Sequence, residues 1–138
     1  MDARTVIERL ELEPHPEGGH YRETWRHDPG DGSRGAGTAI LFLLAAGERS
    51  HWHRVDADEL WHFHAGHALR LETSDGQRTH ASILGVHLDE GERPQLLVPA
   101  GEWQAAESQG AWTLVSCTVS PAFDFAGFEL APEGWQPG

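Results

Sequence analysis

Hydrophobic and polar residues alternate with a period of two along most of the chain, which is the pattern of β-strands with one buried face. Gly, Pro, Asp and Ser cluster between the alternating segments, and Asp75-Gly76 is a pair typical of a tight β-hairpin. The clearest segments cover residues 21–26, 68–74, 77–84, 94–98 and 111–119, with an uninterrupted apolar run over residues 38–44. About nine or ten short strands separated by turns predict an all-β fold, either an antiparallel barrel or a jelly roll.

The N-terminal residues follow a different period. Val6, Ile7 and Leu10 recur at helical spacing, which predicts a short helix from about Asp2 to Leu12. With 138 residues the chain has the size of one ordinary domain. We therefore expect a single domain over residues 1–138.

Acidic residues outnumber basic ones by 22 to 10, and the formal net charge is −12. Such a charge repels phosphate groups, so we expect neither nucleic acid nor an anionic membrane as a partner. The expected partners are a small molecule and a second copy of the chain. The single cysteine, Cys117, allows no internal disulfide. Without a signal sequence or an apolar run of about eighteen residues, the expected location is the cytoplasm.

The stretch Gly47–Gly66 concentrates four histidines and two tryptophans. His51 and His53 are two residues apart, so on a regular strand both imidazoles leave the same face about 6.7 Å apart. On a straight strand Glu59 would lie about 20 Å from His53. A site that contains all three side chains therefore requires the chain to reverse direction within residues 54–58.

Two chemistries fit these three residues. Two imidazoles and one carboxylate form the face that proteins use for iron, and zinc, nickel or manganese also suit this donor set. Alternatively, the three side chains form a buried polar cluster that binds an organic ligand without metal. In that case Glu59 would raise the pKa of His53, and the two would act as a general acid–base pair. The residues by themselves leave both alternatives open.

Two sets of motifs carry a resemblance to a known family. The spacing Gly47-x3-His51-x-His53-x5-Glu59-x6-Gly66, followed by Gly91-x7-Pro99-x-Gly101-x2-Gln104, resembles the two motifs of the cupin superfamily. The segments His15-Pro-Glu-Gly-Gly-x-Tyr21, Trp52-His-Arg54, Asp58-Glu-x-Trp61, Pro99-Ala-Gly-x-Trp103 and Cys117-x-Val-x-Pro-Ala-Phe-Asp-Phe125 resemble an uncharacterised branch called cupin type 5.

The resemblance implies a jelly-roll β-barrel of two antiparallel sheets with a pocket at its open end, in a protein that is usually a homodimer. It implies no single reaction, because cupins include dioxygenases, isomerases, sugar epimerases, storage proteins and sensors. Gln104 stands where the superfamily usually has a metal-binding histidine, and it could add only a neutral amide oxygen to a metal. The spacing from His53 to Glu59 is one residue longer than usual.

The resemblance also suggests how a metal-free site would work. Sugar epimerases among the cupins use a histidine base and a tyrosine acid, and Tyr21 could supply the second proton beside His53. The alternative for Tyr21 is a strand residue that packs on Trp25.

Further residues of the pocket wall follow from strand parity. Trp61 and Phe63 have the parity of Glu59 and are expected in the pocket wall, with Trp103 at the rim; the alternative is that these aromatic residues belong to the core. Glu17 precedes two glycines that let the backbone approach a ligand or shape a bend. His62 and His64 have the opposite parity and are expected between sheets or at a dimer contact.

These observations predict a small-molecule-binding cupin. In the first version it is an enzyme in which His51, His53 and Glu59 hold a divalent metal (Fe, Zn, Ni or Mn) and act on a small polar substrate, such as a sugar or an organic acid. In the second it is a metal-free isomerase or epimerase. In the third it is a non-catalytic ligand-binding or sensory module.

Overall fold

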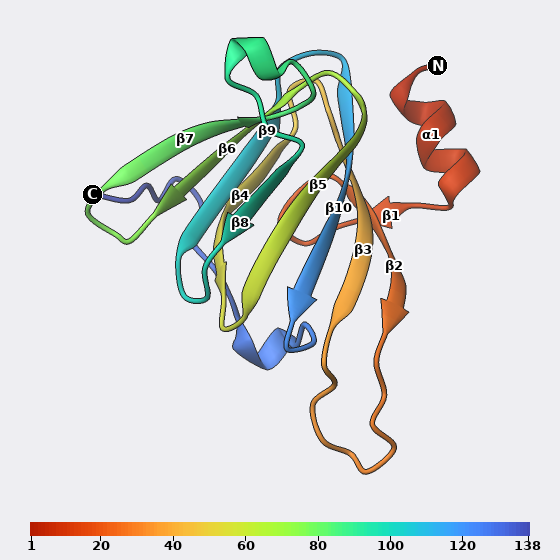
Figure 1. Ribbon diagram of the computed structural model, residues 1–138, viewed down its shortest axis with the longest axis vertical. Helices are drawn as coiled ribbons and strands as arrows, with labels where there is room; N and C mark the ends of the chain where they lie inside the picture. Colours follow the sequence, from red (N-terminus) through yellow and green to blue (C-terminus); the bar gives the residue numbers. More distant parts are fainter.

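A computed structural model describes residues 1–138 and shows two antiparallel sheets that face each other (Figure 1). The strands are β1 (Glu13–Pro14), β2 (His20–Arg26), β3 (Thr38–Ala45), β4 (Arg49–Val55), β5 (Asp58–Gly66), β6 (Leu69–Ser74), β7 (Thr79–Leu84), β8 (Gln95–Val98), β9 (Trp103–Ser108), β10 (Trp112–Ser120) and β11 (Phe128–Leu130). One sheet has six strands in the order β1-β2-β3-β10-β5-β8, and the other has five in the order β11-β4-β9-β6-β7. The predicted all-β jelly roll with a short N-terminal helix is confirmed.

The helix α1 (Ala3–Leu10) begins at Asp2, whose side chain accepts a hydrogen bond from the Thr5 N–H at 2.9 Å. Glu11 has a left-handed backbone conformation and ends it, so the helix is shorter than predicted. Val6 on α1 packs with Leu43 of β3 on the outside of the six-stranded sheet. Two 3-10 turns, η1 (Leu88–Glu90) and η2 (Phe125–Gly127), complete the helical elements, and none of the helices is long and apolar enough to cross a bilayer.

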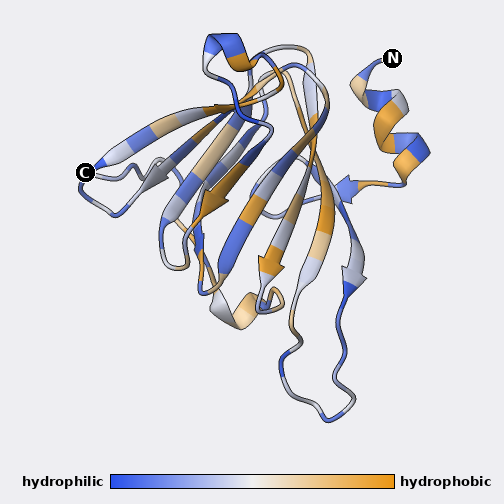
Figure 2. Cartoon of the chain, viewed as in Figure 1, coloured by the Kyte–Doolittle hydropathy of each residue, from blue (hydrophilic) through white to orange (hydrophobic).

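The hydrophobic core lies between the two sheets, where side chains of both inner faces meet. Phe42, Trp61, Leu69, Leu84 and Val115 are all nearly inaccessible to solvent there. Burial of each large apolar side chain contributes roughly 1.5–3 kcal/mol to folding. Figure 2 shows hydrophobic residues concentrated along β3 and alternating with hydrophilic ones along β5, as expected for strands with one inward face.

The connection from β4 to β5 positions the site. β4 ends at Val55 and β5 begins at Asp58, so the chain reverses at Asp56-Ala57 and passes from the five-stranded to the six-stranded sheet. The Asp56 N–H donates to the Gly127 carbonyl at 3.1 Å, which holds this turn in place. The predicted reversal within residues 54–58 is therefore confirmed, and it brings His53 and Glu59 to opposite walls of one pocket.

Candidate functional site

A pocket opens between the sheets at the end where β4 turns into β5. Its cavity volume is about 50 Å³, within about 570 Å³ of space that includes open solvent. Its polar side chains come from both sheets and from the segment before β2, and they are His15, Glu17, Tyr21, Glu23, Thr38, His53 and Glu59. Apolar residues that include Val55, Val119 and three phenylalanines form the rest of the wall. The pocket thus combines buried proton-carrying groups with an apolar mouth.

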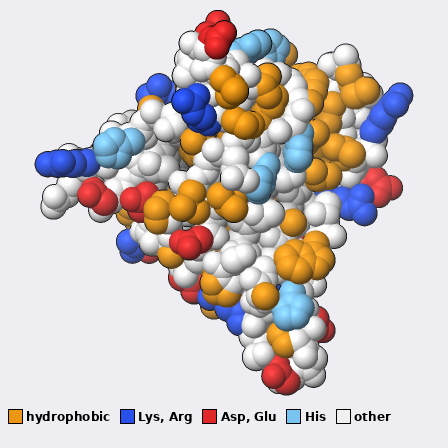
Figure 3. Space-filling view, viewed as in Figure 1, with side chains coloured by type: hydrophobic (Ala, Val, Ile, Leu, Met, Phe, Trp, Pro, Cys, Tyr) orange, Lys and Arg blue, Asp and Glu red, His pale blue; other side chains and the backbone are white.

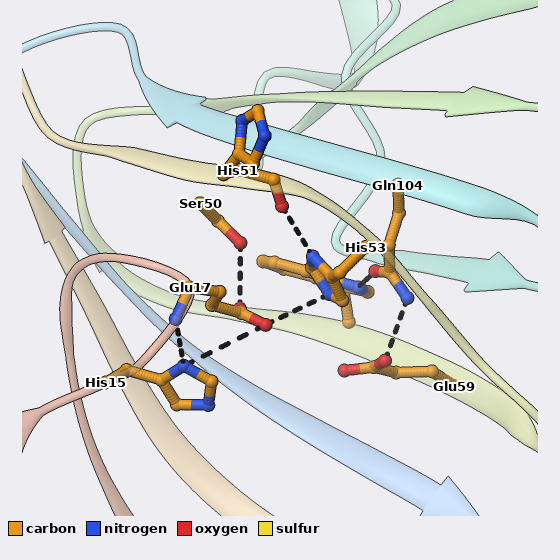
Figure 4. Close-up of polar contacts among 8 residues, drawn as sticks. His15, Glu17, Ser50, His51, His53, Glu59 and Gln104 are labelled. Carbon is orange, nitrogen blue, oxygen red and sulfur yellow. Dashed lines mark hydrogen bonds and ion pairs between the residues drawn. The ribbon is translucent and has the colours of Figure 1, made fainter. Parts of the chain in front are cut away.

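His53 lies at the centre of the polar contacts and is 2% exposed. Its Nδ1 lies 2.7 Å from the His51 carbonyl oxygen and its Nε2 lies 3.1 Å from Oε2 of Glu17 (Figure 4). A carbonyl can only accept, so Nδ1 carries a hydrogen. The contact between Nε2 and Oε2 then needs one proton, which either the imidazole or the carboxyl group holds. His53 and Glu17 therefore form a pair that shares a single proton.

Burial sets the state of this pair. It raises the pKa of Glu17 to about 8, against the opposing effect of the Ser50 hydroxyl, which donates to Oε1 at 2.7 Å. Burial also lowers the pKa of His53. Both shifts favour uncharged groups, so the carboxyl group of Glu17 holds the proton and donates it to Nε2 of His53.

A close backbone contact explains why Glu17 reaches this position. The His51 N–H donates to the Glu17 carbonyl at 2.9 Å, which joins the bend before β2 to β4. Gly18 has φ +112°, and a Cβ atom there would lie 2.1 Å from the Arg49 carbonyl oxygen. Only glycine fits such an approach. The glycine pair therefore does more than shape a bend, because it lets Glu17 enter the pocket as the direct partner of His53.

His15 is a site residue that no spacing signal in the sequence points to. Its Nδ1 accepts a hydrogen bond from the Glu17 N–H at 3.0 Å, so the hydrogen of the neutral ring lies on Nε2. Burial, with a smaller effect of the nearby His53, lowers the pKa of His15 to about 4. Its ring packs edge-on against Tyr21, with centroids 4.4 Å apart. Only the motif His15-Pro-Glu-Gly-Gly could have indicated that His15 belongs to the site, because it places His15 next to the bend that contains Glu17.

Glu59 occupies the opposite wall and is 7% exposed. Gln104 donates through Nε2 to Oε1 of Glu59 at 2.9 Å, while Oε1 of Gln104 accepts from the Trp61 indole N–H at 2.8 Å. Burial raises the pKa of Glu59 to about 7; the nearby Glu17 raises it further, while His53 and the Gln104 bond oppose the shift. Figure 4 shows the second carboxylate oxygen turned toward the space below Glu17 and His53. Glu59 can therefore gain or lose a proton near neutral pH.

The prediction that His51 and His53 converge on one ion is wrong. The pairing of β4 with β9 shifts register between Ser50 and His53, which is the signature of a β-bulge. The extra residue lets Ser50 and His53 both face inward and turns His51 away, where its Nε2 lies 3.0 Å from the Pro132 carbonyl oxygen. Strand parity assumes a regular period of two, so it cannot predict the bulge or the outward orientation of His51.

The donor groups do not fit the predicted metal site. Both ring nitrogens of His53 already have partners, and the amide oxygen of Gln104 is bound by Trp61. No group of three or more His, Cys, Asp or Glu side chains is arranged to hold a metal ion. Of the predicted set, the structure brings His53, Glu59 and Gln104 together, because Gln104 pairs with His53 across β4 and β9 and donates to Glu59, but His51 turns away.

The aromatic residues predicted for the pocket wall lie elsewhere. Trp61 faces inward as its parity requires, but it is 1% exposed and belongs to the core. Phe63 packs against the same core, because each step of two residues along a strand moves a side chain about 6.7 Å deeper. Trp103 lies on the outer face of the five-stranded sheet, where its ring packs at a tilt against that of Trp135, with centroids 4.5 Å apart, and the Arg54 guanidinium lies over it. The core alternative therefore holds for Trp61 and Phe63.

Three phenylalanines form the aromatic wall of the pocket instead. Phe123, Phe125 and Phe128 line it on the segment after β10, with ring centroids 4.9 to 5.9 Å apart. The sequence shows these residues as a cluster but contains no local signal that places them over the site. Tyr21 lines the same pocket and packs against His15, and its role in proton transfer stays a prediction.

His62 and His64 leave the face opposite to Glu59, as their parity predicts, and this is the outer face of the six-stranded sheet. The expected place between the sheets is therefore wrong, and the dimer contact stays a prediction. Nε2 of His62 lies 3.1 Å from the Thr118 hydroxyl, and His64 contacts the Ser116 hydroxyl. Figure 3 shows histidine side chains at the surface among hydrophobic ones. Neither residue takes part in the pocket.

Comparisons with known proteins agree with this architecture. The family model described as "Cupin superfamily (DUF985)" matches residues 4–131. Protein SO0799 from Shewanella oneidensis is 45% identical, with a TM-score of 0.90 over 95% of this chain and 85% of that chain. A hypothetical protein from Leishmania major is 35% identical, with a TM-score of 0.85 over 95% and 88%.

More distant structures share the fold alone. A dTDP sugar isomerase from Desulfovibrio desulfuricans is 17% identical, with a TM-score of 0.61 over 89% of this chain and 88% of that chain. No curated protein matches the chain.

Proposed function

The chain belongs to the cupin superfamily, in the branch described as DUF985, and from this premise we infer that it is a small-molecule-binding cupin whose own side chains perform acid–base chemistry in the pocket. The observation that supports this inference best is the pair of Glu17 and His53, which shares one proton in a desolvated site. Opposite the pair, Glu59 is able to take up a proton near pH 7. One wall thus holds an acid and the other a base.

This arrangement suits an isomerisation, in which one proton leaves the substrate and another returns at a different position. Glu59 in its ionised form accepts the proton that leaves. Glu17, which the contact with His53 holds in position, donates its proton to the substrate. The Ser50 hydroxyl, which donates to Oε1, stabilises the carboxylate that results. The roles reverse for the return reaction, and no oxidant or reductant is required. General acid–base catalysis of this kind typically contributes about 10²–10⁴-fold to a rate.

A specific contact distinguishes this proposal from the sequence-based hypothesis of a His53–Glu59 pair. The carboxyl group in direct contact with His53 is that of Glu17, at 3.1 Å. Tyr21 lies at the same pocket, and we propose it as a binding residue, because its ring packs against His15 and its hydroxyl is free to contact a ligand. The non-catalytic alternative uses the same pocket to bind a ligand without turnover.

Exchange of carbon-bound hydrogen tests the proposal before any product has been identified. The protein is incubated in D2O with a panel of cyclic ketones, aryl ketones and aldoses, and deuterium incorporation next to the carbonyl carbon is followed by NMR. We expect exchange above the buffer rate for at least one compound. Glu59→Gln and His53→Gln should reduce the exchange by about 100-fold or more, whereas His62→Gln, on the outer face, should not.

Two outcomes contradict the proposal. Uniform buffer rates across the panel would favour the non-catalytic alternative, since the acid and the base would then move no proton of a ligand. Exchange that persists in Glu59→Gln would show that the base lies elsewhere.

A further inference from the structure

The charge of the pocket restricts its ligand. No arginine lines it, the chain contains no lysine, and its two histidines are kept neutral by burial. Three carboxyl groups line it, but Glu23 is paired with Arg26 through two contacts of 2.7 and 2.9 Å. The remaining charge belongs to Glu17 and Glu59, and no cationic group of the protein faces it.

The arginines that contact the segment at the mouth of the pocket are already bonded to other groups of the protein. Arg26 donates to the Phe123 carbonyl at 2.9 Å, and Arg34 donates to the Ala122 carbonyl at 2.7 Å. Arg34 also forms two bonds with Asp56, at 3.0 and 2.8 Å. These contacts fix the segment that carries the phenylalanines but leave no guanidinium free for an anionic ligand.

The mouth has the chemistry that attracts organic cations. The rings of Phe123, Phe125 and Phe128 meet edge to face, and the Phe128 ring lies 5.6 Å from that of His53. Ring faces attract ammonium groups, and the attraction increases when water is excluded. Deeper in the pocket, Glu59 presents an oxygen that accepts no bond from Gln104, on a side chain that is more than nine-tenths buried (Figure 4).

We propose that the pocket selects a small ammonium ligand with a flat apolar body, the amine donating to Glu59 and the body lying against the three phenylalanines. The inference rests on the proposed function in that it assigns a ligand class to the same pocket. It excludes anions such as carboxylic acids and sugar nucleotides, because the ionised carboxylate of Glu59 would repel them and no cation would compensate. An ammonium group supplies the positive charge that the pocket lacks.

A matched set of probes tests the role of charge with the body held constant. Benzylamine, benzyl alcohol and benzoate share one ring and differ in being cationic, neutral and anionic. Each is titrated into the full-length protein at pH 8 and followed by NMR chemical shifts and by calorimetry. We expect benzylamine to bind most tightly and benzyl alcohol more weakly, with a difference between benzylamine and benzoate on the order of 100-fold.

The pH dependence identifies the carboxyl group that receives the amine. The groups that face Glu59 are Glu17, His53, Gln104 and Cys117. Benzylamine stays cationic between pH 6 and 8, whereas Glu59 loses its proton near pH 7, so affinity should rise by about 10-fold over this range. Glu17 adds a smaller increase toward pH 8.

Two variants and one control complete the experiment. Glu59→Gln should remove most of the rise in affinity with pH, and the exposed Glu90→Gln, on η1, should retain it. Should Glu59→Gln fail to fold, Phe125→Ala serves instead, because Phe125 is 57% exposed; it should weaken benzylamine binding by about 5-fold.

Three results would overturn the inference. Benzoate that binds as tightly as benzylamine would show that charge does not select the ligand. Equal binding of all three probes would likewise show that the charge of the ligand does not determine its affinity. No binding of any probe at millimolar concentration would show that the aromatic wall does not receive a flat body. Selective binding of benzylamine without any hydrogen exchange on the ketone panel would contradict the proposed catalysis but leave the ligand class in place.

Discussion

The proton shared by Glu17 and His53 makes the stability of the protein depend on pH in a defined window. In the folded state the pair keeps one proton until Glu17 ionises at a pKa of about 8. In the unfolded chain the two groups titrate near 4.5 and 6.5, so above pH 6.5 both have lost their protons. Between pH 6.5 and 8 the folded state binds one more proton than the unfolded state, and stability must fall as the pH rises.

The magnitude follows from the width of this window. One pH unit with a difference of one proton changes the free energy of unfolding by about 1.36 kcal/mol. A window of about 1.5 units therefore predicts a loss of about 2 kcal/mol between pH 6.5 and 8. His15, with a pKa of about 4, does not change its protonation there. Glu59, at about 7, adds a smaller loss, and because the nearby Glu17 helps to raise the pKa of Glu59, part of this loss also disappears when the carboxyl group at position 17 is removed.

Glu17→Gln isolates the contribution of the pair. The amide can still accept from Ser50 and donate to Nε2 of His53, but it has no proton to lose, so we expect the loss of about 2 kcal/mol to disappear. The measurement is urea denaturation at pH 6.5 and 8 of the wild type, of Glu17→Gln and of the exposed control Glu90→Gln. Equal pH dependence in wild type and Glu17→Gln, or a wild type that gains stability at pH 8, would refute the reasoning.

Three further predictions concern the framework of the site. Gly18→Ala should destabilise the protein by about 2 kcal/mol or more, because the new Cβ meets the Arg49 carbonyl, whereas Gly30→Ala, with open space around it, should cost less; thermal unfolding compares the two. Arg34→Ala should release the phenylalanine segment and weaken benzylamine binding by about 5-fold, as titration would show; an unchanged affinity would contradict the role given to this arginine. The homodimer stays a prediction, which sedimentation equilibrium would confirm as two chains per particle and a monomer at all concentrations would contradict.

Sequence periodicity determined the fold and one feature of the site. Alternation of apolar and polar residues identified the strands, because one face of each strand is buried and the side-chain period of a strand is two. The distance argument from His53 to Glu59 located the reversal at residues 54–58, because a straight strand would hold the two groups too far apart. Both inferences use only the geometry of neighbouring residues.

The partners within the pocket were decided by tertiary structure. A single bulge in β4 turned His51 outward, and such a bulge arises from the pairing with β9, which lies far away in the sequence. Glu17 meets Ser50 although the two are 33 residues apart, and it does so because the Gly18 backbone approaches β4 closely.

The sequence also did not determine how deeply each inward-facing side chain lies between the two sheets. Trp61 and Glu59 have the same parity, yet Trp61 belongs to the core and Glu59 to the pocket, since their positions along β5 place them at different levels between the sheets. A sequence pattern states which face a side chain leaves, and this depends on the local backbone alone. Which group it meets there depends on how two sheets and the segment that closes them pack together, and long-range burial and hydrogen bonding decide that.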